Sequence, residues 1–332
     1  MLTMDQNTCH LPAPSFMKRT IRAGIRDNLF QNYPPPMGYD WLHEQILDDI
    51  GLSDTDAKVC ITDGAGPAIY QILTFLKNSN GRFIDSDPAW KWPREYVKEM
   101  PQFLVPGKIK PKHIQGADVI NIVNPQNPIG HTYMVDELIE IKDAAKENGA
   151  WILYDCTYKD FLNEYYAIYQ DYPEKTFITL SYSKSPGLAG LRTGAVVCSP
   201  DNMKAVFGLR GNQLGSSSIG QLAAGASLHT KSEWLPKLKK TTIANRDYII
   251  DNLKDMPVEF PYEFNFGNSL WIDLPQHNST DLWKSLSEKG ILVRDGIYYK
   301  SLDNPERQFF KVTTSVPKKW CIQFTEEFKA LL

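Results

Sequence analysis

The chain has 332 residues, of which 42% are hydrophobic and 23% charged, and its formal net charge is −3. This length suits one large domain with a smaller one, and so small a net charge gives no electrostatic reason to expect nucleic acid or an anionic membrane as a partner. No run approaches the roughly 20 apolar residues of a membrane-spanning helix, and no secretory signal is recognisable at the start. The five cysteines are scattered, which favours a cytoplasmic protein with reduced thiols. The six histidines are scattered too, so no metal site is expected.

The first 40 residues contain NYPPPMG at residues 32–38, whose three prolines exclude regular structure there. We expect this part to form an arm and a crossing segment. From residue 59 to residue 197, short apolar runs alternate with amphipathic stretches. The runs expected to be buried strands are 59–62, 82–85, 119–123, 151–154, 176–180 and 194–198, and the helical stretches include 67–77 and 135–148. This alternation indicates βαβ units, that is, an α/β fold with a mostly parallel sheet flanked by helices.

After about residue 232 the pattern changes. A long charged helix is followed by segments in the order strand, helix, strand, strand and helix, which is typical of a small α+β domain. We therefore expect an N-terminal arm with part of the small domain at residues 1–40, a large domain at 41–235 and a small α+β domain at 236–332.

Several polar segments follow predicted strands, where open α/β sheets place their ligands. They are TDGAGP (62–67), DPAWKWP (87–93), NPQNPIG (124–130), YDCTY (154–158) and SYSKSPGLAGLRTG (181–194). The last segment places Lys184 among hydroxyls, with Arg192 eight residues later, and nearby positive charge and burial lower the pKa of an amine. Hydroxyls beside a guanidinium suit an anion, most simply a phosphate. Each of these segments, taken alone, also has a purely structural explanation. These explanations are a surface loop, a turn, packing of aromatic residues under a loop, or a helix N-cap at Asp155.

Three of these segments together resemble the fold-type I enzymes that use pyridoxal 5'-phosphate (PLP), specifically the class I/II aminotransferases. That family carries N-P-x-N-P-x-G, Y-D-x-x-Y and S-x-S-K-x-x-G-L-x-G-x-R-x-G in this order. In this chain 28 residues separate Asn127 from Asp155, and 29 separate Asp155 from Lys184. The resemblance covers about residues 58–315 and is closest to the histidinol-phosphate aminotransferase branch.

The resemblance implies roles for four residues around the cofactor ring. Lys184 would form a Schiff base with PLP and later move a proton between the substrate Cα and the cofactor. Asp155 would keep the pyridine nitrogen protonated. Asn127 and Tyr158 would donate hydrogen bonds to the ring oxygen.

The resemblance also implies a phosphate site. Arg192 and the hydroxyls of Ser181 and Ser183 would hold the phosphate. Gly64 and Ala65 open a predicted helix, and backbone N–H groups at a helix N-terminus bind phosphate. The next residues, Gly66 and Pro67, depart from the polar or acidic pair that is usual in the family.

Two aromatic assignments follow less directly. The family stacks a ring on the pyridine, but its stacking position falls on Pro93, so we expect Trp92 or Trp90 to replace it, on equal terms. Tyr33 matches a tyrosine that reaches the phosphate of the neighbouring subunit, which implies a homodimer with shared active sites.

The residues expected to bind the substrate carboxylate differ from those of the family. The family's carboxylate-binding arginine on a C-terminal strand is replaced by Lys311, which offers a point charge instead of a planar fork. Arg294, in a segment matching G-[IV]-x-V-R, is the best substitute, although a surface arginine would fit as well. Lys311 can bind a carboxylate more loosely, Arg294 can take its place, or the substrate can lack a conventional α-carboxylate. The N-E-N-P-x-G stretch of the family is absent.

Three functions are therefore weighed. The first is an aminotransferase that moves an amino group between an amino acid and a 2-oxo acid in a ping-pong cycle. The second keeps PLP but is a decarboxylase or β-lyase of the same fold, an alternative that Lys311 leaves open. The third is a non-catalytic or nucleotide-binding α/β protein, which the residues matching the family around Lys184 disfavour.

Overall fold

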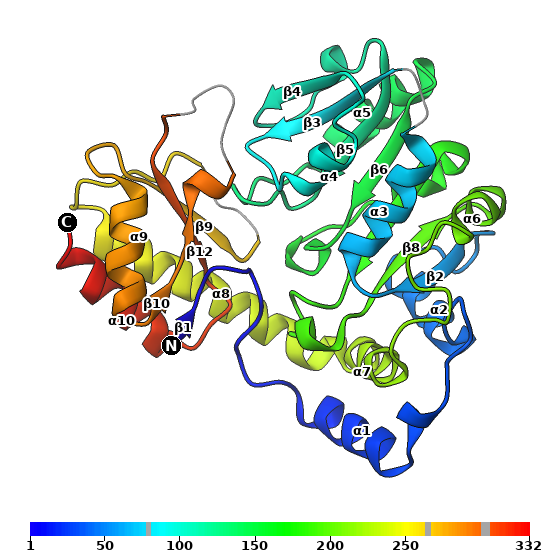
Figure 1. The fold of residues 1–332 in the computed structure, drawn as a ribbon, viewed down its shortest axis with the longest axis horizontal. Helices are drawn as coiled ribbons and strands as arrows, with labels where there is room; N and C mark the ends of the chain where they lie inside the picture. Colours follow the sequence, from blue (N-terminus) through cyan, green and yellow to red (C-terminus); the bar gives the residue numbers. More distant parts are fainter. Residues whose placement is uncertain (78–80, 263–266, 300–305) are drawn as a thin grey trace.

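The computed structural model describes residues 1–77, 81–262, 267–299 and 306–332. Figure 1 shows two groups of elements, a large sheet surrounded by helices and a smaller group that holds both the first strand and the last helix. The long helix α8 (Lys231–Leu253) runs between them. No helix in those four ranges combines the length and the apolar character needed to cross a membrane.

Within the described residues, the large sheet has seven strands in the order β2-β8-β7-β6-β5-β3-β4. They are β2 (Lys58–Thr62), β3 (Arg82–Asp87), β4 (Gln102–Pro106), β5 (Ala117–Val123), β6 (Trp151–Asp155), β7 (Thr176–Ser181) and β8 (Gly194–Cys198). β8 runs antiparallel to both neighbours, and the other strands are parallel to one another. The expected α/β fold with a mostly parallel sheet is confirmed.

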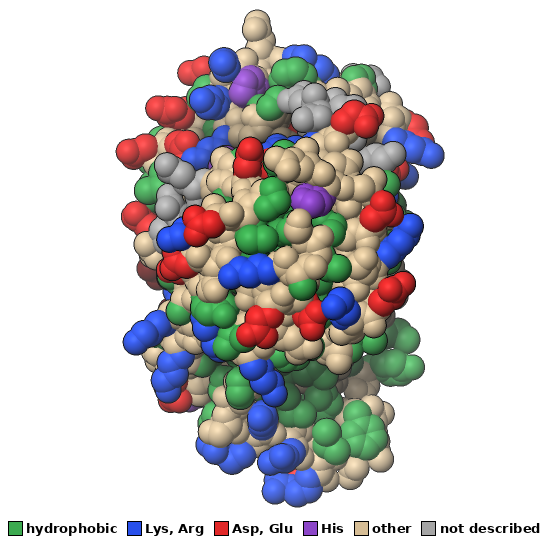
Figure 2. Space-filling view, turned by 90° about the vertical axis from the view of Figure 1, so that its left-hand side faces the viewer, with side chains coloured by type: hydrophobic (Ala, Val, Ile, Leu, Met, Phe, Trp, Pro, Cys, Tyr) green, Lys and Arg blue, Asp and Glu red, His purple; other side chains and the backbone are tan. Residues whose placement is uncertain are grey.

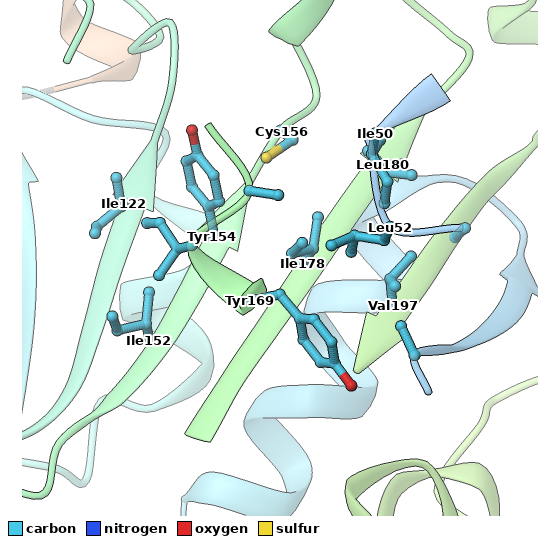
Figure 3. Close-up of a cluster of buried hydrophobic side chains, with 14 of the residues drawn as sticks. Ile50, Leu52, Ile122, Ile152, Tyr154, Cys156, Tyr169, Ile178, Leu180 and Val197 are labelled. Atoms are coloured by element: carbon cyan, nitrogen blue, oxygen red, sulfur yellow. The ribbon is translucent and has the colours of Figure 1, made fainter. Parts of the chain in front are cut away.

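Helices cover both faces of this sheet because alternate strand residues point to opposite sides. On one face, buried strand side chains pack with α2 (Asp40–Asp49), α5 (Val135–Glu147) and α7 (Ser218–His229). Figure 3 shows part of that layer, including Ile122, Ile152, Ile178 and Val197. On the other face, strand residues such as Phe83 pack with α3 (Ala65–Leu76) and α6 (Pro200–Phe207). The short helix α4 (Trp92–Tyr96) follows β3.

Helix α1 (Ser15–Arg26) and strand β4 are among the elements of this part that the sequence patterns do not predict. Helix α1 lies in the expected arm and packs on α7. Gly24 permits this approach, since a Cβ there would lie 2.6 Å from a side-chain carbon of Leu222. Strand β4 is at the edge of the sheet and only one of its five residues is buried, so it has no continuous buried apolar run to reveal it.

The smaller group contains the order of elements expected after residue 236. Strands β9 (Ser269–Asp273), β11 (Arg294–Asp295) and β12 (Phe309–Thr313) form an antiparallel sheet in the order β11-β12-β9. Helices α8, α9 (Ser279–Glu288) and α10 (Lys318–Lys329) contribute apolar side chains to the same core. The N-terminal strand β1 (Leu2–Thr3) pairs in parallel with β10 (Ile291–Leu292), so the start of the chain is attached to this group. The proposed domain boundaries at residues 40 and 235 stay a prediction.

Candidate active site

A cavity of about 410 Å³ is lined by residues that follow β5, β6 and β7 and by residues of β11 and β12. From the set predicted on sequence, the lining contains Ala65, Asn127, Asp155, Tyr158, Ser181, Ser183, Lys184, Arg192, Arg294 and Lys311. Gly64 is adjacent to Ala65 at the N-terminus of α3. Trp92 and Tyr33 are not part of the lining. The structure therefore gathers most of the predicted residues, from segments far apart in sequence, around one space.

Lys184 lies in the loop after β7, and its Nζ donates a hydrogen bond to the backbone oxygen of Gln6 at 2.8 Å. Burial, together with the positive charge of Arg192, lowers the pKa of Lys184 to about 8, although the carboxylate of Asp155 opposes the shift. An amine with this pKa is partly unprotonated near neutral pH, which is the form that can act as a nucleophile or a base.

Asp155 is the last residue of β6 and is 5% exposed. Its Oδ1 accepts hydrogen bonds from the backbone N–H of Thr157 at 3.0 Å and from Oγ1 of Thr179 at 3.2 Å. Burial raises the pKa of Asp155, and the hydrogen bonds from Thr157 and Thr179 oppose that shift. Because neither hydrogen bond uses Oδ2, this oxygen can accept a proton donor from the cavity.

Asn127 and Tyr158 lie together and share a partner from the N-terminal segment. Nδ2 of Asn7 donates to Oδ1 of Asn127 at 3.3 Å and to the hydroxyl of Tyr158 at 3.2 Å. The hydroxyl of Tyr299 also donates to Oδ1 of Asn127, at 3.4 Å. Burial raises the pKa of Tyr158, so this hydroxyl stays protonated and can donate.

One end of the cavity is built for an anion. Gly64 precedes α3 with a φ of 105°, and a Cβ there would lie 2.8 Å from Nη2 of Arg192. The guanidinium is fixed by hydrogen bonds to the backbone oxygens of Asp63 and Ala189, both at 2.9 Å. Ser181 Oγ accepts from the backbone N–H of Ser183 at 3.2 Å. A fixed guanidinium, hydroxyls and the N-terminus of a helix converge here, a donor set that suits a phosphate.

The structure favours Trp90 over Trp92 as the aromatic residue at this site. Trp92 is 55% exposed and its Nε1 donates to the hydroxyl of Tyr298 at 3.2 Å. The reason is local, since Trp92 is the first residue of α4 and its side chain turns outward there. Trp90 and Pro93 line the cavity instead. Pro93 occupies the position that the resemblance assigns to the stacking ring.

Tyr33 is 78% exposed and lies outside the cavity of its own chain. A single chain therefore gives this side chain no contact with the site. If Tyr33 reaches a phosphate, that phosphate belongs to another copy of the chain.

Arg294 and Lys311 form the opposite wall. They are direct partners in the register of β11 and β12, and both line the cavity. Arg294 Nη2 lies 3.1 Å from Oδ2 of Asp5. Lys311 is 3% exposed, and burial lowers its pKa well below the ordinary value, with the charges of Lys184 and Arg294 adding to the shift and Asp5 opposing it.

The sequence patterns miss the contribution of the N-terminus. Asp5, Gln6 and Thr8 line the cavity, and Asn7 bonds to two of the predicted residues. The only signal is that these polar residues follow a short strand, as the other site segments do, and β1 is only two residues long. Their position depends on the pairing of β1 with β10, some 290 residues later, which no local pattern reveals.

Comparisons with known proteins show what this chain is similar to. A family model described as aminotransferase class I and II matches residues 103–323. The chain is 27% identical over 267 residues to an aspartate aminotransferase of Pyrococcus horikoshii, covering 74% of this chain and 68% of that one. It is 24% identical over 321 residues to a histidinol-phosphate aminotransferase of Pseudomonas putida, covering 92% and 86%. Among solved structures, a PLP-bound putative aminotransferase from Clostridium difficile 630 superposes with a TM-score of 0.83 at 18% identity, covering 99% of this chain and 92% of that one.

Proposed function

Since this chain belongs to the class I and II aminotransferase family, whose members depend on PLP, we propose that the cavity around Lys184 is where the cofactor and the substrate react. The protein is a PLP-dependent aminotransferase with the type I fold, and it uses amino acid and 2-oxo acid substrates. The observation that carries the assignment of the site is the gathering of Asn127, Asp155, Tyr158, Lys184 and Arg192 around one cavity.

The residues present fit PLP. Gly64 has no side chain, and a Cβ there would collide with Arg192. The space that it leaves has room for a phosphate beside that guanidinium. Ser181, Ser183 and the N-terminus of α3 would supply the remaining donors. Asp155 has a carboxylate oxygen free of its two fixed hydrogen bonds, which suits a protonated ring nitrogen.

When bound, the cofactor supplies a ring that accepts the electrons released as the substrate Cα loses its proton. Asp155 would hold the ring nitrogen in its protonated form. Lys184 would attach the cofactor through its amine and, once released by the incoming substrate, carry a proton to and from the substrate Cα. A pKa of about 8 suits that task, because the amine can take up and give back a proton near neutral pH. Asn127 and Tyr158 would donate to the ring oxygen.

The substrate carboxylate is assigned to the wall formed by Arg294 and Lys311. Arg294 is a cation and Lys311 becomes one when it is protonated, and the two residues lie side by side on paired strands. Asp5 balances the charge of Arg294, so a protonated Lys311 leaves one net positive charge for one carboxylate. Trp90 would lie on the face of the ring.

We also propose that the protein is a homodimer. Exposed apolar side chains are concentrated between residues 25 and 41, namely Ile25, Phe30, Tyr33 and Trp41. Figure 2 shows hydrophobic and basic side chains gathered in its lowest part, where Figure 1 places α1. Clustered exposed apolar side chains are typical of a protein–protein interface. Light scattering that gives the mass of one chain at assay concentration would rule the dimer out.

A cytoplasmic location remains part of the proposal. It rests on the thiols, since all five cysteines are free, as is usual in a reducing compartment. Four of them are buried, and burial raises the pKa of Cys60 to about 11, so these thiols are poorly reactive.

A panel of amino acids, each assayed with 2-oxoglutarate and the PLP-loaded protein, tests the function. We expect at least one amino acid to yield its oxo acid and glutamate in equal amounts. Carbon dioxide or ammonia released without glutamate would contradict transamination and support a decarboxylase or β-lyase.

A further inference from the structure

We propose that Asn7 is a positioning residue, which orients Asn127 and Tyr158 so that both direct hydrogen-bond donors into the cavity. The proposal rests on the proposed function, because the acceptor for these donors would be the ring oxygen of PLP. Asn7 belongs to none of the motifs by which the family is recognised in this chain.

Asn7 is fully buried and its backbone is fixed by the smaller sheet. Its N–H donates to Oγ1 of Thr313 at 2.9 Å, and its carbonyl oxygen accepts from Nδ2 of Asn268 at 2.8 Å. Thr313 also donates to Oδ1 of Asn7 at 3.3 Å. The backbone φ of 56° is in the left-handed region, which asparagine tolerates better than most residues. The side-chain oxygen is thus held by Thr313 of the smaller sheet. The NH2 group lies between the two sheets, where it contacts Oγ of Ser269 in β9 and reaches Asn127 and Tyr158 after the strands of the large sheet.

The position of that NH2 group determines how Asn127 is oriented. Oδ1 of Asn127 accepts from Asn7 and from the hydroxyl of Tyr299. If the Asn127 amide were reversed, its NH2 group would face the NH2 group of Asn7, and the hydrogen bond between these two residues would be lost. The Nδ2 of Asn127 therefore points away from Asn7, where it can donate to a ligand in the cavity.

The same NH2 group orients Tyr158. The tyrosine hydroxyl accepts from Asn7 at 3.2 Å, so its own proton has to point in another direction. Burial raises the pKa of Tyr158, which keeps that proton in place. Since both Asn127 and Tyr158 line the cavity, Asn7 leaves the site with two donors oriented before any ligand arrives.

Two donors at the ring oxygen stabilise its negative charge and so favour loss of the proton shared with the neighbouring nitrogen. Without Asn7, the amide of Asn127 can reverse and the hydroxyl of Tyr158 can rotate. The pH at which the bound cofactor changes its visible absorption should then rise. We expect the reaction rate to change less directly than this midpoint, because Asn7 acts only through Asn127 and Tyr158.

The test is a pH titration of the visible absorption of the PLP-loaded protein, from about pH 5 to about pH 10. Asn7→Gly removes the amide, and glycine adopts a φ of 56° freely. We expect its midpoint to lie roughly one pH unit or more above that of the wild type, the effect of weakening a hydrogen bond to a charged oxygen. Asn28→Gly is the matched control, since Asn28 has nearly the same φ, 57°, at an exposed position, and its midpoint should equal that of the wild type.

Asn7→Asp keeps the shape of the side chain but has no N–H, and its carboxylate would draw the Tyr158 proton out of the cavity. Its midpoint should rise at least as far as that of Asn7→Gly, and this variant carries the test if Asn7→Gly does not fold. A midpoint equal to the wild-type value in either variant, with PLP bound, overturns the role of Asn7. A wild-type protein that takes up no PLP would instead overturn the proposed function, and this inference with it.

Discussion

Two lysines line the cavity, and their surroundings separate their roles. Lys184 follows β7 in a loop, beside Asp155, and its pKa is lowered to about 8. Lys311 lies inside β12, and burial lowers its pKa well below that of a free lysine, with the neighbouring cations Lys184 and Arg294 adding to the shift. Lys311 is therefore easily deprotonated in the empty site, and an incoming carboxylate favours its charged form. If Lys311 binds the carboxylate as proposed, this proton uptake makes its binding depend on pH, unlike that of an arginine.

The sign of this linkage gives a prediction for the pH dependence of KM. Because the pKa of Lys311 is depressed, raising the pH removes its proton and weakens carboxylate binding, so KM should rise with pH, by at most about tenfold per unit. In Lys311→Arg the guanidinium stays charged, so KM should change less over the same range. Steady-state kinetics of both proteins, with one amino acid substrate across a pH series, measures the difference. Parallel KM profiles would contradict the assignment of Lys311 to the carboxylate.

Single residues differ in how far the sequence reveals them. Asn127, Asp155 and Lys184 stand in long ordered motifs after strands, and the structure brings them to one cavity. Trp90 could not be separated from Trp92 by pattern, because the start of α4 decides which ring turns outward. The choice depends on local backbone direction, which composition and spacing do not specify.

At the scale of elements, burial decides what the sequence predicts. Strands β2, β3 and β5 to β8 are buried over nearly all their length and contain continuous apolar runs, so the sequence predicts them. Edge strand β4 and the two-residue strand β1 have no such run. The approach of α1 to α7 depends on a tertiary contact at Gly24, which no local periodicity encodes.

The junction between β2 and α3 is the element most sensitive to a small change. Gly64→Ala would place a Cβ 2.8 Å from the Arg192 guanidinium, at a φ of 105° that alanine adopts only with strain. We expect Arg192 to be displaced and the dissociation constant of PLP to rise about tenfold or more, corresponding to a loss of ~1.4 kcal/mol.

Gly51→Ala is the control for backbone strain alone. Gly51 has a φ of 70°, and a Cβ there would meet nothing within 4 Å. Its PLP affinity, measured by fluorescence titration of the apoprotein, should match that of the wild type. Equal affinity for Gly64→Ala would show that the phosphate is held elsewhere.

At the scale of the whole molecule, the site needs both sheets and the N-terminal segment. The large sheet supplies the residues that we propose bind the cofactor, β11 and β12 supply Arg294 and Lys311, and residues 5–8 contribute to the same cavity. The pairing of β1 with β10 fixes that segment in place. Because these pieces meet only after the chain has folded, the sequence reveals the cofactor half of the site more fully than the substrate half.

Borohydride reduction followed by peptide mapping tests the central claim most directly. The PLP-loaded protein is reduced, digested and analysed by mass spectrometry, and Lys184→Ala is treated in the same way. The added mass of the reduced cofactor should appear on the peptide that contains Lys184 and be lost in the variant, together with full turnover. A label on Lys311 or another lysine, or the absence of any label, would contradict the assignment of the cofactor to Lys184.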